Sequence, residues 1–236
     1  MKNNLARVAA ALALGSAGMA SQAAVVNLTG WAFGSGNYVD VATPAHKGSA
    51  GGFKGSVNFS AAEEAAGFTD ILGNGFITYC VEINEHFSFS NGDMAGYAVQ
   101  SASAYVRSFD GTAFGTATAS RLGKLMSYVA SNAALVDTAA ESTALQLAVW
   151  NIVYDADNSL NAGPFKENSA ADNFKSYANS LLTASAGAQN KYDVYILSKS
   201  GSQDFLLLRE LPEPTSLALA FVALGGMGAV ARRRKA

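Results

Sequence analysis

The sequence predicts an α+β fold, in which an antiparallel β-sandwich or barrel carries an inserted helical subdomain, with an N-terminal signal peptide and a C-terminal single membrane helix. Three patterns lead to this prediction. Short β-rich runs separated by glycine-containing turns occupy residues 25–89, apolar residues at helical spacing occupy residues 118–186, and a period of two returns after Lys191. Half of the 236 residues are hydrophobic and 10% are aromatic, which is enough material for a core.

The first residues of the chain have the pattern of a targeting segment. Residues 1–24 combine Lys2 and Arg7 with an apolar run and end in small residues. This order is typical of a secretory signal peptide, with cleavage expected after Ala23 or Ala24. The rest of the chain is therefore expected to be exported.

The body, residues 25–210, is expected to form one domain. Strands are predicted at residues 25–33, 38–43, 52–59 and 76–89, with turns at residues 34–36 and 47–51. Helices are predicted at residues 121–129, 143–154 and 170–183, with Asp137 as the cap of the second. Residues 192–198 and 205–209 flank a turn and predict a hairpin that rejoins the sheet.

The last residues form a second targeting pattern. The apolar run of 15 residues at 217–231 precedes a basic cluster, Arg232, Arg233, Arg234 and Lys235. As a helix this run covers about 22 Å, short for a hydrocarbon core of ~30 Å, and the flanking residues extend it. The basic end is expected to stay on the cytoplasmic side.

Pro212, Glu213 and Pro214 stand directly before this run. The tripeptide, the apolar segment and the basic end together resemble the PEP-CTERM sorting signal of Gram-negative bacteria, over residues 211–236. The resemblance implies processing by an exosortase and a transient inner-membrane anchor. It also implies delivery to the cell surface or to the extracellular matrix, where exopolysaccharide is a candidate partner.

Charge and residue inventory exclude several functions. The formal charge is −2, and six of the 16 basic residues lie in the two terminal segments, so the body is acidic and a nucleic-acid partner is not expected. The single cysteine excludes an internal disulfide and a cysteine-based zinc site. His46 and His86 lack metal-ligand spacing and are expected on the surface, and Glu82 and Glu85 are expected on opposite strand faces. No hydrolase elbow, Walker loop or dinucleotide fingerprint is present. We therefore expect no enzyme, no metal and no cofactor.

Cys80 and Gln146 are the remaining candidates for chemistry. Ile77, Tyr79, Val81 and Ile83 are expected on one apolar face of a strand, so Cys80 is expected on the other. Gln146 is the one polar residue in the apolar run 145–150, and a buried amide requires hydrogen-bond partners. From these residues alone, a satisfied core glutamine and a free thiol are favoured over a reactive pair.

Two short motifs around these residues resemble the thioester domains of bacterial surface adhesins. They are Tyr79-Cys80-Val81 and Leu145-Gln146-Leu147-Ala148-Val149-Trp150, and Leu145 stands where such domains often have threonine. The resemblance implies an internal thioester between Cys80, in a strand near the middle of the sheet, and Gln146, on a helix facing it. Tyr79 and Trp150 would shield the bond from water.

The resulting expectation is an exported surface or biofilm-matrix protein that captures partner amines covalently and serves in adhesion. The alternative is a non-covalent matrix or polysaccharide-associated structural protein of the same fold, without a thioester.

Overall fold

The structure is a computed structural model that describes residues 23–68, 71–168 and 173–211. Residues 1–22 of the expected signal peptide and residues 212–236 of the expected sorting signal, including Pro212, Glu213, Pro214 and Arg232–Arg234, lie outside the described residues. Within the described ranges, no helix has both the length and the hydropathy needed to span a bilayer.

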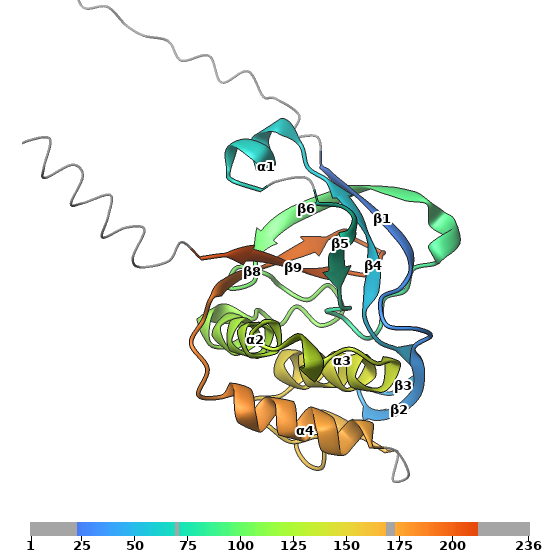
Figure 1. Cartoon of the computed structure of the whole chain (residues 1–236), viewed down its shortest axis with the longest axis vertical. Helices are drawn as coiled ribbons and strands as arrows, with labels where there is room; N and C mark the ends of the chain where they lie inside the picture. The colour runs from blue at the N-terminus through green and yellow to red at the C-terminus, as the bar shows by residue number, and fades with distance from the viewer. Residues whose placement is uncertain (1–22, 69–70, 169–172, 212–236) are drawn as a thin grey trace, which may run out of the picture.

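The main element is a six-stranded antiparallel sheet that curls into a nearly closed barrel (Figure 1). Its strand order is β5-β4-β1-β6-β8-β9. The strands are β1 (Ala24–Trp31), β4 (Phe53–Asn58), β5 (Ile71–Thr78), β6 (Asp93–Ser101), β8 (Tyr192–Ser198) and β9 (Phe205–Glu210). The two edge strands meet where Cys80, just after β5, forms an antiparallel bridge with Phe205. Of the two predicted architectures, the barrel is the one observed.

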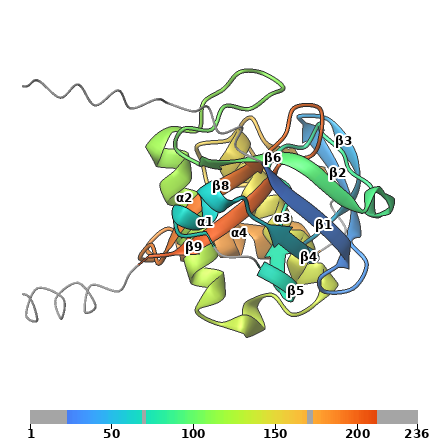
Figure 2. The ribbon, with the colours of Figure 1, turned by 90° about the horizontal axis from the view of Figure 1, so that it is seen from above.

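A helical block is inserted between β6 and β8, which are neighbours in the sheet. Its helices are α2 (Gly115–Ala130), α3 (Ala139–Tyr154) and α4 (Phe174–Ser185), and a short α1 (Ala61–Ala65) precedes β5. Single 3₁₀ turns span Phe89–Asn91 and Ala133–Leu135. Figure 1 shows α2 and α3 against one end of the barrel and α4 on their far side. Seen from above, the strands of the barrel lie in front of α3 and α4 (Figure 2).

Helix α3 is buried almost all round because it lies between the barrel and α4. The helix begins four residues earlier than the predicted run at 143–154, and its cap lies one residue later than predicted. Its cap is Thr138, not Asp137: the Thr138 hydroxyl accepts a hydrogen bond from the Glu141 backbone, and the Glu141 carboxylate accepts one from the Thr138 backbone. This reciprocal pair satisfies two free N–H groups at the start of the helix, which Asp137 alone would not do.

Several strand boundaries differ from the prediction. The strand expected at residues 76–89 ends at Thr78, and β6 was not predicted. The turn expected at residues 47–51 is mostly strand β3 (His46–Ala50), which pairs with β2 (Asn37–Thr43) in a three-stranded sheet completed by β7 (Lys166–Glu167). The pairing partner overrides the weak strand preference of Lys, Gly and Ser in β3.

Gly55 in β4 marks the closest approach of two strands in the barrel. It faces Leu28 next to a register shift in β1. A Cβ atom at residue 55 would lie 1.9 Å from the backbone oxygen of Asn27. Because a backbone atom cannot rotate away as a flexible side chain can, only glycine fits here.

Substituting Gly55→Ala is therefore expected to lower the free energy of unfolding by about 1–3 kcal/mol or more, since β1 and β4 must move apart. Chemical denaturation followed by circular dichroism measures the change. Gly187→Ala is the matched control, because a Cβ at residue 187 meets no atom within 4 Å. Equal stabilities of the two variants would contradict the close approach.

Candidate functional site

The five residues after β5, Tyr79–Ile83, lie between strand β9 and helix α3. On the side of the sheet, the Leu206 N–H donates to the Tyr79 carbonyl at 3.0 Å, and the Val81 N–H donates to the Asp204 carbonyl at 2.9 Å. These bonds continue the sheet for two more residues beyond the end of β5. They fix which backbone groups of the segment are left to face the helix.

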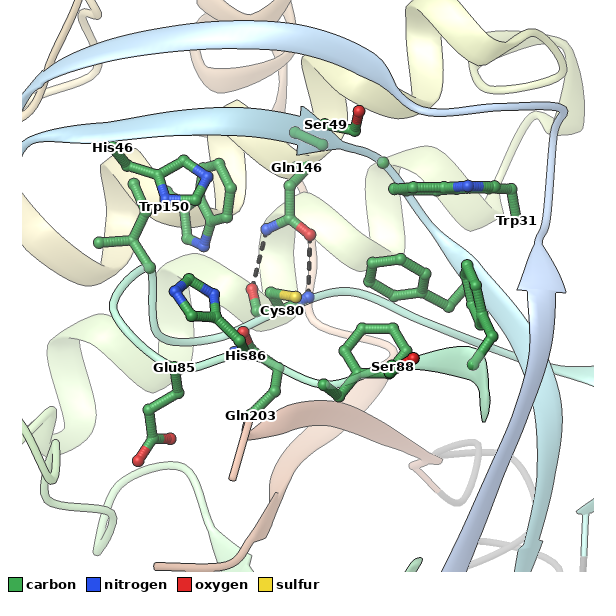
Figure 3. A pocket seen from close by; sticks show the side chains of 16 residues that line it. Trp31, His46, Ser49, Cys80, Glu85, His86, Ser88, Gln146, Trp150 and Gln203 are labelled. Atoms are coloured by element: carbon green, nitrogen blue, oxygen red, sulfur yellow. Dashed lines mark hydrogen bonds between the residues drawn. The ribbon is translucent and has the colours of Figure 1, made fainter. Parts of the chain in front are cut away.

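On the side of the helix, the backbone is held by side chains of α3. The Cys80 N–H donates to Gln146 Oε1 at 2.8 Å, and Gln146 Nε2 donates to the Cys80 carbonyl at 2.8 Å (Figure 3). The Ile83 N–H donates to the Tyr154 hydroxyl at 3.1 Å. A glutamine side chain thus takes the place that a neighbouring strand would have.

The structure places Cys80 differently from the sequence prediction. It lies at the closing edge of the barrel, not near the middle of the sheet. The predicted alternation is also wrong: Ile77 is 42% exposed, whereas Thr78 is buried and all five residues from Tyr79 to Ile83 are buried. A segment covered by a sheet on one side and a helix on the other has no solvent-facing row of side chains.

One face of α3 carries a polar or aromatic side chain at every fourth residue. These residues are Ser142, Gln146, Trp150 and Tyr154. Ser142 Oγ accepts a hydrogen bond from the Gly52 N–H at 2.7 Å, and Gln146 and Tyr154 hold the segment after β5. Trp150 differs from the others: its indole N–H is buried and has no hydrogen-bond partner among the described residues. We call these four residues the α3 stripe.

A cavity of about 290 Å³ opens beside Cys80 and Gln146. Figure 3 shows Trp31 on one side of this pair, and His46, His86 and Trp150 on the other. The aromatic side is continued by rings packed on Trp31 and on one another, those of Phe53, Phe87 and Phe89. His86 and Phe89 are exposed, so the cavity reaches the surface.

The two histidines were expected on the surface, and their place in this cavity was not predicted. His46 begins β3 and is half-buried, and its ring centroid lies 6.2 Å from that of His86 and 5.6 Å from that of Trp150. Burial lowers the pKa of His46, and the nearby His86 lowers it further. The His46 imidazole is therefore neutral at pH 7 and free to accept a proton.

The thiol itself is shielded and protonated. Cys80 is a free cysteine with 8% of its surface exposed, and burial raises the pKa of its thiol. Its sulfur is three covalent bonds from the backbone nitrogen that donates to Gln146 Oε1, and both residues line the same cavity.

The two residues expected to shield the pair lie on different sides of it. Trp150 lines the cavity. Tyr79 packs instead against β4 and α3: its hydroxyl lies 3.4 Å from Ser142 Oγ, and a Cβ at Gly52 would come within 2.8 Å of its ring. Tyr79 thus separates the pair from the interior between β4 and α3, and Trp150 bounds it toward the cavity.

A buried carboxyl cluster lies within and beside the same segment, at Glu82 and Asp204. Tyr105 Oη donates to Glu82 Oε1 at 2.7 Å and lies 2.5 Å from Asp204 Oδ2. A hydroxyl has one proton, so Asp204 must supply the proton of the second bond. Consistent with this, burial raises the pKa of Asp204 to about 7.

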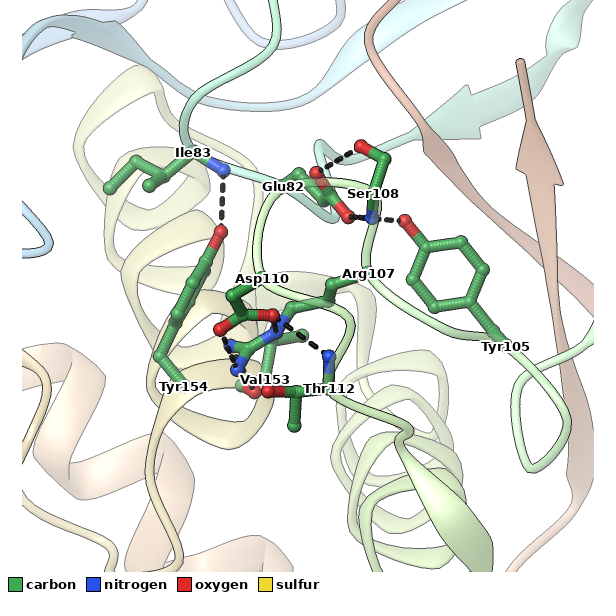
Figure 4. Close-up of polar contacts among 9 residues, drawn as sticks. All are labelled: Glu82, Ile83, Tyr105, Arg107, Ser108, Asp110, Thr112, Val153 and Tyr154. Carbon is green, nitrogen blue, oxygen red and sulfur yellow. Dashed lines mark hydrogen bonds and ion pairs between the residues drawn. The ribbon is translucent and has the colours of Figure 1, made fainter. Parts of the chain in front are cut away.

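The loop that brings Tyr105 to this cluster also brings Ser108. Figure 4 shows Ser108 and Tyr105 converging on Glu82, with the Arg107–Asp110 ion pair beside Tyr154. Ser108 Oγ lies within hydrogen-bond distance of both Glu82 and Glu85. The expectation that these two carboxylates point to opposite faces is therefore wrong, because the chain turns after Cys80 instead of continuing as a strand.

Asp204 gives the protein a pH-dependent stability. Because its folded-state pKa of about 7 lies above the ordinary value of 3.8, the stabilisation is complete below about pH 4 and is lost as the pH rises through about 7. Asp204→Asn imitates the protonated acid, so the loss, on the order of 2–4 kcal/mol, should disappear in this variant. Urea denaturation from pH 4.5 to 8 measures it.

Asp193→Asn is the control for this experiment, because Asp193 forms an ion pair with Arg209 on the surface and is 44% exposed. Its removal should shift the stability by less than about 1 kcal/mol at every pH. If Asp204→Asn and the parent protein keep the same pH profile, Asp204 is not the buried acid described above.

Comparisons with known proteins give no indication of the function of this site. No family model, no curated protein and no solved structure matches this chain. The likeness to thioester domains therefore rests on the residues around Cys80 and Gln146. A function has to be inferred from the chemistry that this site can perform.

Proposed function

We propose that the protein is exported and captures a partner covalently through an internal thioester between Cys80 and Gln146. The supporting observation is the clamp of the Gln146 amide on the backbone of Cys80, at 2.8 Å on both sides and beside a surface cavity. A glutamine needed only for packing would not have to face the one cysteine of the chain.

Formation of the bond follows from the same contacts. The Cys80 sulfur attacks the amide carbon of Gln146, the carbon–nitrogen bond breaks, and the nitrogen leaves as ammonia with the thiol proton. The Cys80 N–H already donates to the amide oxygen, so it stabilises the negative charge that develops there. Because burial keeps the thiol protonated, a base is needed, and the neutral His46 lines the same cavity.

Capture of the partner consumes the thioester. A partner amine attacks the acyl carbon and forms an amide bond to Gln146. The carbon–sulfur bond breaks, and the sulfur takes up the amine proton, so that Cys80 is again a thiol. Burial slows the competing attack by water, because Gln146 is fully buried, Cys80 is 8% exposed and Trp150 bounds the cavity beside them. The event happens once per molecule, so the protein is not an enzyme in this proposal.

The sorting segment supplies the location. The described domain ends with β9 at Glu210, directly before the tripeptide Pro212-Glu213-Pro214. Cleavage there by an exosortase would leave the barrel complete and free it from the inner membrane. The captured partner would then be on the cell surface or in the extracellular matrix.

One observation favours the alternative, a non-covalent matrix or polysaccharide-associated protein. Both polar atoms of the Gln146 amide are already satisfied by the backbone of Cys80. The pair could serve only to close the barrel, with the cavity binding its ligand reversibly. The mass of the protein separates the two functions.

If the thioester forms, the exported protein should weigh less than its sequence by one ammonia, and its only cysteine should resist iodoacetamide in denaturant. Methylamine should restore the mass, with its own addition, and expose the thiol in the same step. Intact-mass spectrometry before and after both reagents measures this. Cys80→Ala and Gln146→Ala should each abolish the deficit, and Gln146→Ala should leave the thiol open to alkylation.

Gln100→Ala is the matched control, because Gln100 is an exposed glutamine on β6 and its loss should leave the deficit intact. A full sequence mass together with immediate alkylation in denaturant would exclude the thioester. That result would support the non-covalent function.

Replacing Pro212, Glu213 and Pro214 by alanine should leave uncleaved protein in the inner membrane, because the exosortase would have no site. Cell fractionation and immunoblotting measure the distribution. The control replaces Thr215 and Ser216 by alanine, which keeps the tripeptide, and should be released normally. Equal release of both variants would show that the tripeptide is not a sorting signal.

A further inference from the structure

Trp150 is the one member of the α3 stripe whose polar atom is unpaired. Its side chain is 3% exposed, and its N–H has no hydrogen-bond partner among the described residues. Figure 3 shows the indole next to His46 and above His86, where it lines the cavity. A buried N–H without an acceptor costs about 1–3 kcal/mol, so the position calls for a ligand that supplies one.

The Trp150 N–H restricts which chemical groups of a ligand can bind beside it. An indole N–H is only a donor, so the ligand must present a lone pair, whereas an ammonium group has three donors and no acceptor. A protonated amine would therefore leave Trp150 unpaired. A neutral amine has a single lone pair, which must attack the acyl carbon, whereas a hydroxyl oxygen has two and can accept from Trp150 with the other.

The cavity offers an ammonium no counter-ion directly beside the acyl carbon. Glu85 is the acidic residue of the lining: one of its carboxylate oxygens accepts from Ser108 Oγ at 2.8 Å, and the other is buried without a hydrogen-bond partner among the described residues. Figure 3 shows this carboxylate turned away from Cys80 and Gln146. A charge that enters a low-dielectric site without a counter-ion is strongly disfavoured. A neutral hydroxyl avoids that cost, since its oxygen accepts from Trp150 and its proton is donated to an imidazole.

The opposite side of the cavity fits the carrier of such a hydroxyl. The rings of Trp31 and Phe53 lie 4.8 Å apart between centroids, and Phe87 and Phe89 extend the surface. A sugar ring has apolar C–H faces that pack on aromatic rings. The volume of about 290 Å³ lies at the small end of ligand pockets, about 300–1,000 Å³, so it admits one ring and not a folded peptide.

We propose that the cavity selects a hydroxyl of a saccharide as the nucleophile, so that the protein becomes attached to carbohydrate through an ester. This proposal rests on the thioester proposed above. The saccharide oxygen bonds to the acyl carbon of Gln146 as the carbon–sulfur bond breaks. The hydroxyl proton passes to the imidazole of His46 or His86 and then to the sulfur, which restores the Cys80 thiol without any oxidant or reductant.

The experiment offers two nucleophiles to the exported protein. It is incubated with equal concentrations of methyl glycosides of glucose, galactose, mannose and N-acetylglucosamine, and separately with Nα-acetyl-lysine amide. Intact mass is expected to show glycoside adducts at least about ten-fold above lysine adducts, a ratio that corresponds to about 1.4 kcal/mol. Alkaline hydroxylamine should remove the glycoside adduct, since under these conditions it cleaves oxygen esters and leaves amides intact.

The variant Trp150→Phe keeps the aromatic ring and loses the N–H. The ratio of glycoside adduct to methylamine adduct should fall about ten-fold or more in this variant. Tyr177→Phe is the matched control, because it removes an aromatic donor on α4 that bonds to the Leu135 carbonyl, outside the cavity lining. Its ratio should equal that of the parent protein.

The outcomes separate the two proposals. A mass deficit with lysine adducts and no glycoside adducts would overturn the saccharide proposal and keep the thioester. No mass deficit before any probe would overturn the thioester, and with it the ester. If Trp150→Phe does not fold, the parent protein still decides the question through its adduct ratio and the hydroxylamine test.

Discussion

The two hydrogen bonds between the Gln146 side chain and the backbone of Cys80 are the contact on which the arrangement of this protein depends. Strand β5 ends at Thr78, and the barrel is completed beyond it by only one bridge to β9. Without another strand on its open side, the backbone at residue 80 would be buried with unpaired polar groups. Helix α3 supplies the missing partners through the side chain of Gln146. This contact places the Gln146 amide next to Cys80.

The same requirement explains the composition of α3. The helix lies between the barrel and α4, so most of its surface must be apolar. On the α3 stripe, the side chains of Ser142, Gln146 and Tyr154 each bond to a backbone group of a neighbouring segment. Trp150 has the same spacing but meets a cavity in place of a backbone group. In the saccharide proposal, structural pairing and ligand recognition thus use one periodic face of one helix.

Local pattern was enough to predict the three longer helices, the final hairpin and the antiparallel character of the sheet, because each depends on residues close in sequence. The short helix α1 was not predicted. Strand β3 could not be found this way, since Lys47 and Gly48 form a strand only because β2 is beside them. His46, at the start of β3, comes close to His86 although 40 residues separate them, and no spacing in the chain indicates this. The pairing of Cys80 with Gln146 came from a likeness of motifs, while the alternation inferred around Cys80 was wrong because both sides of that segment are covered.

The position of the helical block in the chain sets the order in which the molecule can assemble. Strands β6 and β8 pair at Val99 and Leu197, so this ladder closes only after all the residues between them have been brought together. Contacts of such long range form late and slowly in folding. Cys80 meets Phe205 only when the last strand joins the barrel. In the proposed function, the cavity around the sulfur and the amide would therefore be completed only after the whole chain has been brought together.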